Sequence, residues 1–243
     1  MADGGYNAVK HPQHAMPGNP LSSLKKRAEE AVRILSRHYP DARCTLDHRN
    51  PFELLCATIL AAQCTDAKVN TVTPELFRRW PTPQAMAAAD LAEVERVVHP
   101  LGFFRQKARA LVEMSRDIVA IHGGRVPRTM EELTRLRGVG RKTANVLLGT
   151  CFSGGGVIVD THCRRISRRL GLTRQTDPDR IERELMELLP PEHWSIFGHL
   201  MVFHGRAVCD ARRPRCEDCP LLHLCPEGKR RTGAAAAARE AAG

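Results

Sequence analysis

Apolar residues recur at helical spacing through most of this 243-residue chain, and that period limits the folds it can adopt. One stripe comprises Leu24, Ala28, Ala31, Val32 and Leu35, and another comprises Leu111, Met114, Ile118 and Ile121 on a helix that ends at Gly123-Gly124. Further helices are expected at 51–63, 66–80, 90–98, 129–136, 141–151, 161–170, 177–188 and 193–205, with breaks at Pro74 and at 81–83. Only Val-Ile-Val at 157–159 has strand character, so the sequence predicts an all-α fold.

The two ends of the chain differ from this pattern. Residues 1–20 are rich in Gly, Pro and His and are expected to form a flexible arm, and residues 227–243 a disordered tail. The sequence has no apolar segment of the kind found in signal peptides and no stretch long enough to span a membrane. We therefore expect a cytoplasmic protein whose nine cysteines stay out of disulfides. Five scattered cysteines are expected to be small buried residues: Cys44, Cys56, Cys64, Cys151 and Cys163.

The chain is strongly basic, with 37 Lys and Arg residues against 27 Asp and Glu residues and a formal net charge of +10. An excess of this size attracts polyanions and is typical of proteins that bind nucleic acid. A solvated basic surface without a partner has the same composition, so charge alone leaves both interpretations open.

The stretch LTRLRGVGRKTANVLLG predicts two helices joined by a tight turn. The turn consists of Gly138, Val139 and Gly140. Glycines permit positive φ and let a backbone approach a ligand closely. Unpaired N–H groups at the start of the second helix form an anion site, and Arg137 and Arg141 add positive charge beside it. The stretch is thus typical of a motif that binds a DNA phosphate without reading sequence, although an ordinary helical hairpin with a glycine C-cap has the same pattern.

Lys142 lies in the first turn of that second helix, and Asp160 precedes a strongly basic helix in VIVDTHCRRISRRLG. The positive helix end and the adjacent Arg141 favour the neutral amine of Lys142, which is the nucleophilic form. Lys142 is therefore either a nucleophile or a plain phosphate contact. Asp160 is either the N-cap of its helix or a carboxylate that takes the proton of the amine and stabilises a cationic sugar. Spacing alone does not show that the two residues meet.

Four cysteines crowd into the loop CDARRPRCEDCPLLHLC, with the spacing Cys-x6-Cys-x2-Cys-x5-Cys. In a reducing compartment such a cluster is typical of a metal centre. Four thiolates suit an iron–sulfur cluster, whereas structural zinc sites usually use two close Cys pairs; spacing alone leaves the two metals close. The loop also carries Arg212, Arg213 and Arg215, and we expect the metal centre to fix them against a phosphate backbone.

These three motifs, in this order and spacing, resemble the endonuclease III family over roughly residues 22–226. The resemblance implies two all-α domains with a DNA-binding cleft between them. One is a six-helix domain at 44–154 that carries the helix-hairpin-helix, and the other joins 21–43 to 155–226 and carries a [4Fe-4S] cluster. The cluster ligands implied by motif position are Cys209, Cys216, Cys219 and Cys225.

The same resemblance implies a base-excision-repair DNA glycosylase with an apurinic/apyrimidinic lyase activity. Such an enzyme is expected to act as a monomer on double-stranded DNA that contains base lesions or abasic sites, and to remove oxidised pyrimidines. By motif position, Lys142 is the Schiff-base nucleophile for β-elimination and Asp160 is the catalytic carboxylate.

Further DNA contacts follow from motif position. Gln63 in AAQCTD would fill the space left by the extruded base, and Asp66 and His162 also stand in matching motifs. Two positions depart from the family pattern, since Arg137 replaces a proline before Gly-x-Gly and Ala61 replaces a serine.

A third departure lies in Gly102-Phe103-Phe104, where the family commonly has a leucine-like wedge. We expect Phe103 or Phe104 to wedge or stack on DNA, and at least one of them to be a core aromatic.

Three other functions share part of this pattern. A monofunctional glycosylase of the adenine-mispair type would lack a lysine nucleophile and would need a carboxylate in the early buried helix, where none lies between Leu54 and Gln63. A non-catalytic DNA-binding iron–sulfur protein would use Lys142 only to contact phosphate. An electron-transfer iron–sulfur protein would have no use for the hairpin or the positive charge.

Overall fold

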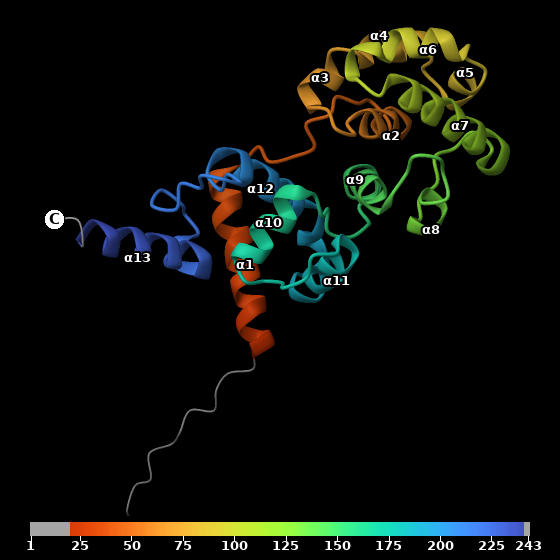
Figure 1. The fold of residues 1–243 in the computed structure, drawn as a ribbon. Coiled ribbons are helices and arrows are strands. Elements are labelled where there is room, and N and C mark those ends of the chain that lie inside the picture. Colours follow the sequence, from red (N-terminus) through yellow and green to blue (C-terminus); the bar gives the residue numbers. More distant parts are fainter. Residues whose placement is uncertain (1–19, 241–243) are drawn as a thin grey trace, which may run out of the picture.

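The computed structural model describes the backbone of residues 20–240 and the side chains of residues 21–233, and no β-strand occurs in this part of the chain. The α-helices are α1 (Pro20–His38), α2 (Pro51–Leu60), α3 (Asp66–Asn70), α4 (Thr73–Arg79), α5 (Pro83–Ala87), α6 (Leu91–Val98), α7 (Phe104–His122), α8 (Met130–Leu133), α9 (Arg141–Cys151), α10 (Thr161–Arg169), α11 (Pro178–Leu188), α12 (Trp194–Ala207) and α13 (Pro226–Glu240). Short 3-10 helices are η1 (His99–Leu101), η2 (Pro191–His193) and η3 (Leu222–Leu224). The all-α prediction is confirmed, and Figure 1 shows α3–α7 gathered in one body and α1, α10 and α11 in another.

The first core surrounds α2, which is buried nearly all round. The helix starts at Pro51 because Asn50 caps it, with its side chain accepting a hydrogen bond from the Glu53 amide at 3.0 Å. The amphipathic α7 covers this core with Leu111, Met114 and Ile118. The fourth residue of the predicted stripe, Ile121, does not reach the core and is 71% exposed. It lies in the last turn of the helix, beyond the residues that cover the rest of the stripe.

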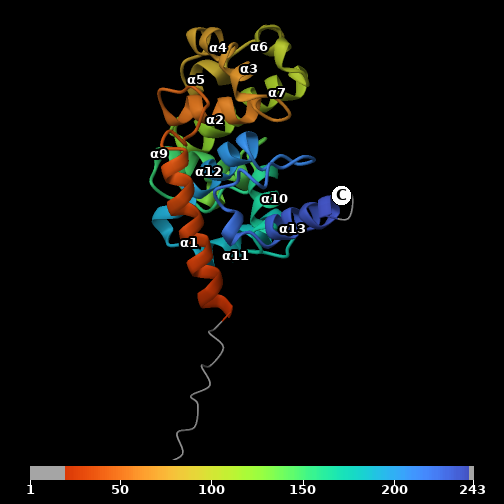
Figure 2. The ribbon, with the colours of Figure 1, turned by 90° about the vertical axis from the view of Figure 1, so that its left-hand side faces the viewer.

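The second core joins α1 to helices of the C-terminal half. It packs α1 against α11 and α12, and α10 against α12, so that residues far apart in sequence share one apolar interior. Arg27 on α1 adds a polar contact by donating to the Leu170 carbonyl at 3.0 Å. Figure 2, turned by 90°, shows the same two bodies stacked one above the other.

The segment at 157–159 runs between the two cores. Val157 and Val159 are buried in the second core, whereas Ile158 is buried in the first. The Cβ of Ile158 lies against α12 at Gly198, where any added Cβ would meet it at 2.7 Å. The strand-like alternation of these residues therefore comes from an extended segment with one apolar layer on each side, rather than from a sheet.

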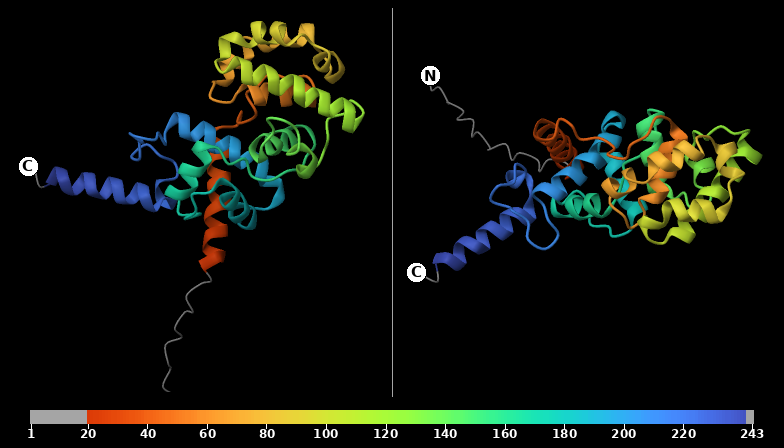
Figure 3. Two further views of the ribbon diagram at one scale, coloured as in Figure 1. Left: turned by 45° about the vertical axis from the view of Figure 1, so that its right-hand side comes forward. Right: turned by 90° about the horizontal axis from the view of Figure 1, so that it is seen from above.

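The chain end corrects one prediction. Where residues 227–243 were expected to be disordered, α13 runs from Pro226 to Glu240, and Figure 3 shows it projecting away from the rest of the molecule. Proline suits the first helical turn, alanine has the highest helix propensity, and Glu227 pairs with Arg230 and Arg231 at 2.9 and 2.7 Å. The expected arm at 1–20 lies outside the described residues, except for Pro20, which begins α1.

Other details refine the predictions. The proline-rich break at 81–83 leads directly into the short helix α5, which packs on α7. Of the five scattered cysteines, Cys56 and Cys163 are buried and the others are half-buried. Between residues 20 and 240, no helix is long and apolar enough to cross a membrane.

Candidate active site and metal centre

A cleft of about 290 Å³ lies between the two cores, and both Lys142 and Asp160 line it. Lys142 comes from the first turn of α9, and Asp160 is the residue that caps α10. The remaining wall is supplied by 43–46, the end of α2 and one face of α12. The structure thus brings together the two residues whose spacing in the sequence could not show that they meet.

The predicted hairpin forms where α8 leads into α9. Gly138 has φ +77° and packs so closely that an added Cβ would lie 3.1 Å from the Cβ of Ala110. The Val139 amide donates to the Leu136 carbonyl at 3.1 Å, which closes the turn. Gly140 is the N-cap of α9 and offers no side-chain acceptor, so the first amides of the helix remain available to an anion.

Asp160 serves its own helix as well as the cleft. Its Oδ1 accepts a hydrogen bond from the Cys163 amide at 2.7 Å, as an N-cap does. The two interpretations of Asp160 are therefore compatible, because a carboxylate has a second oxygen for the cleft. His162, two residues later, turns toward α12: its Nδ1 lies 3.1 Å from the Arg165 guanidinium, beside Gly205. Burial lowers the pKa of His162.

Two predicted DNA contacts have unusual backbones. Gln63 and Phe103 have φ values of +54° and +46°, in the left-handed region that non-glycine residues rarely adopt. Gln63 lines the cleft, and Phe103 is 60% exposed on the first core. Phe104 instead packs into that core, with its ring centroid 4.5 Å from that of His99. Phe103 is therefore the candidate wedge, and Phe104 is the core aromatic.

A buried lysine stabilises the turn at Phe103. The buried Nζ of Lys107 donates to the Leu101 carbonyl at 3.0 Å, and burial lowers the pKa of this lysine. The buried amine thus gives the last carbonyl of η1 a hydrogen-bond partner.

The cleft wall contains residues that no motif pointed to. His199 of α12 lines it, and burial lowers the pKa of this histidine. Arg206, also of α12, lines the cleft too, and its guanidinium lies 3.7 Å from the predicted DNA contact Asp66, which accepts a hydrogen bond from the Thr45 hydroxyl. The sequence of α12 is apolar on most sides, so it gave no signal for the face that meets the cleft.

The arginines near the hairpin have different surroundings. Arg137 is exposed and lies 3.4 Å from Glu113. It lines a hollow together with Arg105, Gln106 and Arg109 of α7. Sequence reasoning missed this α7 surface, although Arg105 and Arg109 stand four residues apart, on one face of a helix. The predicted phosphate contact Arg141 is bound instead to the buried Glu182 at 2.8 Å.

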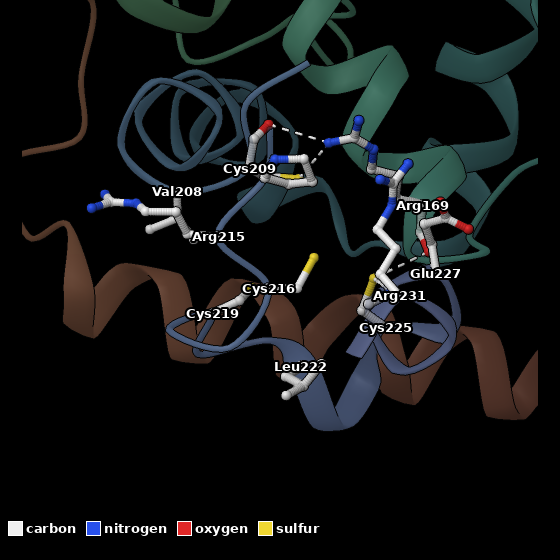
Figure 4. Close-up of a pocket in the computed structure, with 12 residues that line it drawn as sticks. Arg169, Val208, Cys209, Arg215, Cys216, Cys219, Leu222, Cys225, Glu227 and Arg231 are labelled. Atoms are coloured by element: carbon white, nitrogen blue, oxygen red, sulfur yellow. Dashed lines mark hydrogen bonds and ion pairs between the residues drawn. The ribbon is translucent and has the colours of Figure 1, made fainter. Parts of the chain in front are cut away.

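The four loop cysteines surround one pocket (Figure 4). Three of the sulfurs already have polar neighbours from the surrounding helices. Arg169 donates to Cys209 Sγ at 3.2 Å, His204 Nε2 lies 3.5 Å from Cys219 Sγ, and the Gly228 amide donates to Cys225 Sγ at 3.3 Å. These contacts are typical of the N–H···S bonds that surround metal-bound thiolates.

The donor set fits an iron–sulfur cluster. The four sulfurs line a common pocket, and four thiolates are the ligands that such a cluster requires. Burial raises the pKa of Cys219 to about 11 and also raises the pKa of Cys216 and Cys225. A metal centre would supply the positive charge that deprotonates such thiols.

Two arginines of α10 tie the loop to the second core. Arg165 donates to the Cys209 carbonyl at 3.0 Å, and Arg169 donates to the carbonyls of Asp210 and Ala211 at 2.7 and 2.8 Å. The three predicted phosphate contacts on the loop are exposed, and they are Arg212, Arg213 and Arg215. Figure 4 shows Arg215 pointing away from the cysteines.

Comparison with known proteins matches both motifs. Residues 56–191 match the family model described as HhH-GPD superfamily base excision DNA repair protein, and residues 209–225 match the iron-sulfur binding domain of endonuclease III. The chain is 52% identical to endonuclease III from Synechocystis over 86% of its length and 96% of that protein. Two solved structures, a non-covalent endonuclease III–DNA complex and a trapped endonuclease III–DNA covalent intermediate, each superpose with a TM-score of 0.81 at 46% and 45% identity. Each comparison covers 86% of this chain and 98% of the other.

Proposed function

This chain belongs to the endonuclease III family of base excision DNA repair enzymes, and from that premise we propose which of its residues carry out the reaction. It is a bifunctional DNA glycosylase and abasic-site lyase that binds DNA, and its loop binds a [4Fe-4S] cluster. Lys142 is the nucleophile and Asp160 is the carboxylate that assists it. The supporting observation is that both side chains line one cleft between the two cores.

The reaction begins when the amine of Lys142 attacks C1′ of the damaged nucleotide and the base leaves with the electron pair of the glycosidic bond. The free oxygen of Asp160 accepts the amine proton and stabilises the positive charge that develops on the sugar. The lysine-bound sugar opens to a Schiff base. Loss of a C2′ proton then eliminates the 3′ phosphate, and water releases Lys142 from the sugar fragment.

DNA is held through its phosphates. The free amides of α9 receive one phosphate, and Arg105, Arg109 and Arg137 extend the positive surface along the same side. Gln63 and Phe103 enter the duplex where the nucleotide has left the stack. Asp66 and His162 lie at the edge of this surface and orient neighbouring side chains.

Cys209, Cys216, Cys219 and Cys225 hold the cluster, which supplies a rigid centre for the loop. That centre fixes Arg212, Arg213 and Arg215 where they meet the phosphate backbone. The two apolar cores support a division into a domain at 44–154 and a second at 21–43 plus 155–226. We propose that the enzyme acts as a monomer in the cytoplasm on oxidised pyrimidines in duplex DNA.

Borohydride trapping tests the assignment. Incubation with a duplex that contains one abasic site, followed by borohydride, should give a covalent protein–DNA band that Lys142→Ala abolishes. Retained DNA binding without a band in the wild type would favour a monofunctional glycosylase or a binding protein. A band that persists in the Lys142→Ala protein would assign the nucleophile to another amine.

A further inference from the structure

We propose that Arg141, Glu182 and Asn145 form a latch across the two cores that positions Lys142 relative to Asp160. The inference rests on the proposed roles of Lys142 and Asp160. It assigns Arg141, which the hairpin motif suggested as a phosphate contact, to a positioning role instead.

The first half of the latch is an ion pair. Arg141 of α9 makes two hydrogen bonds to Glu182 of α11, with Nε 3.1 Å from Oε2 and Nη2 2.8 Å from Oε1. The Glu182 side chain is only 4% exposed, and its pairing raises the pKa of Arg141. Two parallel bonds of this kind fix both the distance and the orientation of the groups.

The buried carboxylate of Glu182 requires this partner. Breaking a buried pair by removing one partner leaves an uncompensated charge, which costs far more than a surface ion pair contributes. The exposed Asp179 lies 3.7 Å from Arg141. It is a second carboxylate, so it cannot neutralise Glu182 in place of the arginine. Moving Arg141 to a DNA phosphate would therefore leave a buried carboxylate unpaired, and this disfavours the phosphate role.

The second half of the latch lies one turn further along α9. The buried Asn145 accepts a hydrogen bond from the Gly156 amide at 2.7 Å and donates to the Val157 carbonyl at 3.4 Å. Gly156 has no side chain to obstruct this approach, and an added Cβ would lie 2.5 Å from Glu182 Oε1. The two halves of the latch thus meet at Gly156.

The latch holds the two chain segments that carry the reacting groups. Arg141 and Asn145 lie on either side of Lys142 in sequence, and Gly156 and Val157 lead through Ile158 and Val159 to Asp160. The helix that carries the amine and the segment that carries the carboxylate are therefore bonded to each other in the free protein. Pre-set distances of this kind matter because an error of about 1 Å in placement costs about a hundredfold in rate.

The test separates placement from DNA binding. The rate of borohydride-trapped adduct formation is measured at saturating abasic-site DNA, and Kd is measured across a salt series. The variants are Glu182→Gln, Arg141→Ala, the double variant and the conservative Arg141→Lys. Glu187→Gln is the matched control, because it makes the same change to an exposed carboxylate of α11 that is not part of the latch.

If the latch positions Lys142, Glu182→Gln and Arg141→Ala each lower the adduct rate about tenfold or more, with Kd within about twofold and the salt slope unchanged. The double variant is no slower than the worse single variant, and Arg141→Lys recovers part of the rate. Glu187→Gln leaves both the adduct rate and Kd at their wild-type values. Thermal unfolding and the visible absorbance of the cluster identify any variant that fails to fold. If Arg141→Ala fails to fold, the adduct rate of Arg141→Lys decides instead.

A normal adduct rate in Glu182→Gln would overturn the latch while leaving the proposed function intact. So would an Arg141→Ala effect that lies in Kd and lowers the salt slope by about one unit. A wild-type protein that forms no adduct would remove the proposed function, and the positioning role with it.

Discussion

Phe103 and Phe104 are neighbours with opposite environments, and that contrast makes Phe103 the candidate wedge. Sequence reasoning could assign one of them to DNA and one to the core, but it could not choose, because both rings have the same chemistry. The choice depends on the left-handed backbone at Phe103, which turns its ring outward while the next residue begins α7.

Replacing Phe103 with Ala should separate the two activities. We expect excision of a damaged base to slow about tenfold, because no ring then fills the gap in the DNA duplex after the base has left the stack. Cleavage of a duplex with a preformed abasic site should change far less, since there is no base to extrude. Single-turnover rates on the two substrates give the comparison.

Phe104→Ala serves as the counterpart. It should lower the free energy of unfolding by about 2 kcal/mol and leave the ratio of the two rates unchanged, because its ring packs on His99 in the first core. A shift in that ratio for Phe104→Ala, and none for Phe103→Ala, would exchange the roles of the two residues.

At the scale of elements, two helices begin at the cleft and begin differently. α10 is capped by the carboxylate of Asp160, whereas α9 starts at Gly140 with no side-chain acceptor. One helix start therefore provides a charged group to the cleft, and the other leaves its amides for a phosphate.

Asp160 caps its helix and is the proposed catalytic carboxylate, and two substitutions separate the two roles. Asp160→Asn keeps an acceptor for the Cys163 amide, so stability should change little while the adduct rate falls by about 10²–10⁴. Asp160→Ala should show a similar fall in rate and in addition a decrease of about 1 kcal/mol in stability, measured by urea unfolding. Equal stabilities for the two variants would show that the cap contributes nothing.

The two hairpin glycines should also respond differently. Gly138→Ala should destabilise the protein by about 1 kcal/mol or more, because alanine disfavours φ +77° and its Cβ would crowd Ala110. Gly140→Ala meets no atom within 4 Å and has negative φ, so the free protein should keep its melting temperature. Its added methyl stands at the anion site, however, and we expect weaker DNA binding in a titration at fixed salt.

Elements also mark where sequence reasoning was limited. The hairpin and the long α7 could be predicted, because each depends on residues close together in the chain. The helix α13 could not be predicted from apolar periodicity because its sequence has no apolar face, and it is supported by local charge pairs and alanine propensity instead. The segment at 157–159 had the alternation of a strand, but only the two cores explain it.

At the scale of the whole molecule, two basic patches are candidate DNA contacts. One patch contains Arg105, Arg109 and Arg137, and the other lies on the cluster loop. Sequence reasoning anticipated the loop from its composition, yet it missed the α7 patch and the pairing of Arg141 with Glu182. Both features depend on how distant segments of the chain pack together, which the order of charges in the sequence does not show.

Removing the loop arginines should weaken binding in a salt-dependent way. Replacing Arg212, Arg213 and Arg215 with Ser should reduce the slope of log K against log salt by about 0.9 for each phosphate that the variant no longer neutralises. The adduct rate at saturating DNA should stay near the wild-type value, because Lys142 and Asp160 lie on other elements. An unchanged slope would mean that these arginines do not touch the phosphate backbone.

The division of the second core between α1 and the last helices has a consequence for synthesis. The first core is built from residues up to Leu148 together with Ile158, so it can form while the ribosome is still translating the rest. The first helix, by contrast, packs against α11 and α12, and its apolar face at Ala28, Ala31 and Leu35 lacks these two partners until residues 178–207 have emerged. A nascent chain at that stage combines a folded body with an exposed apolar helix near its leading end. That helix is where we expect a chaperone to bind first and a protease to cut first.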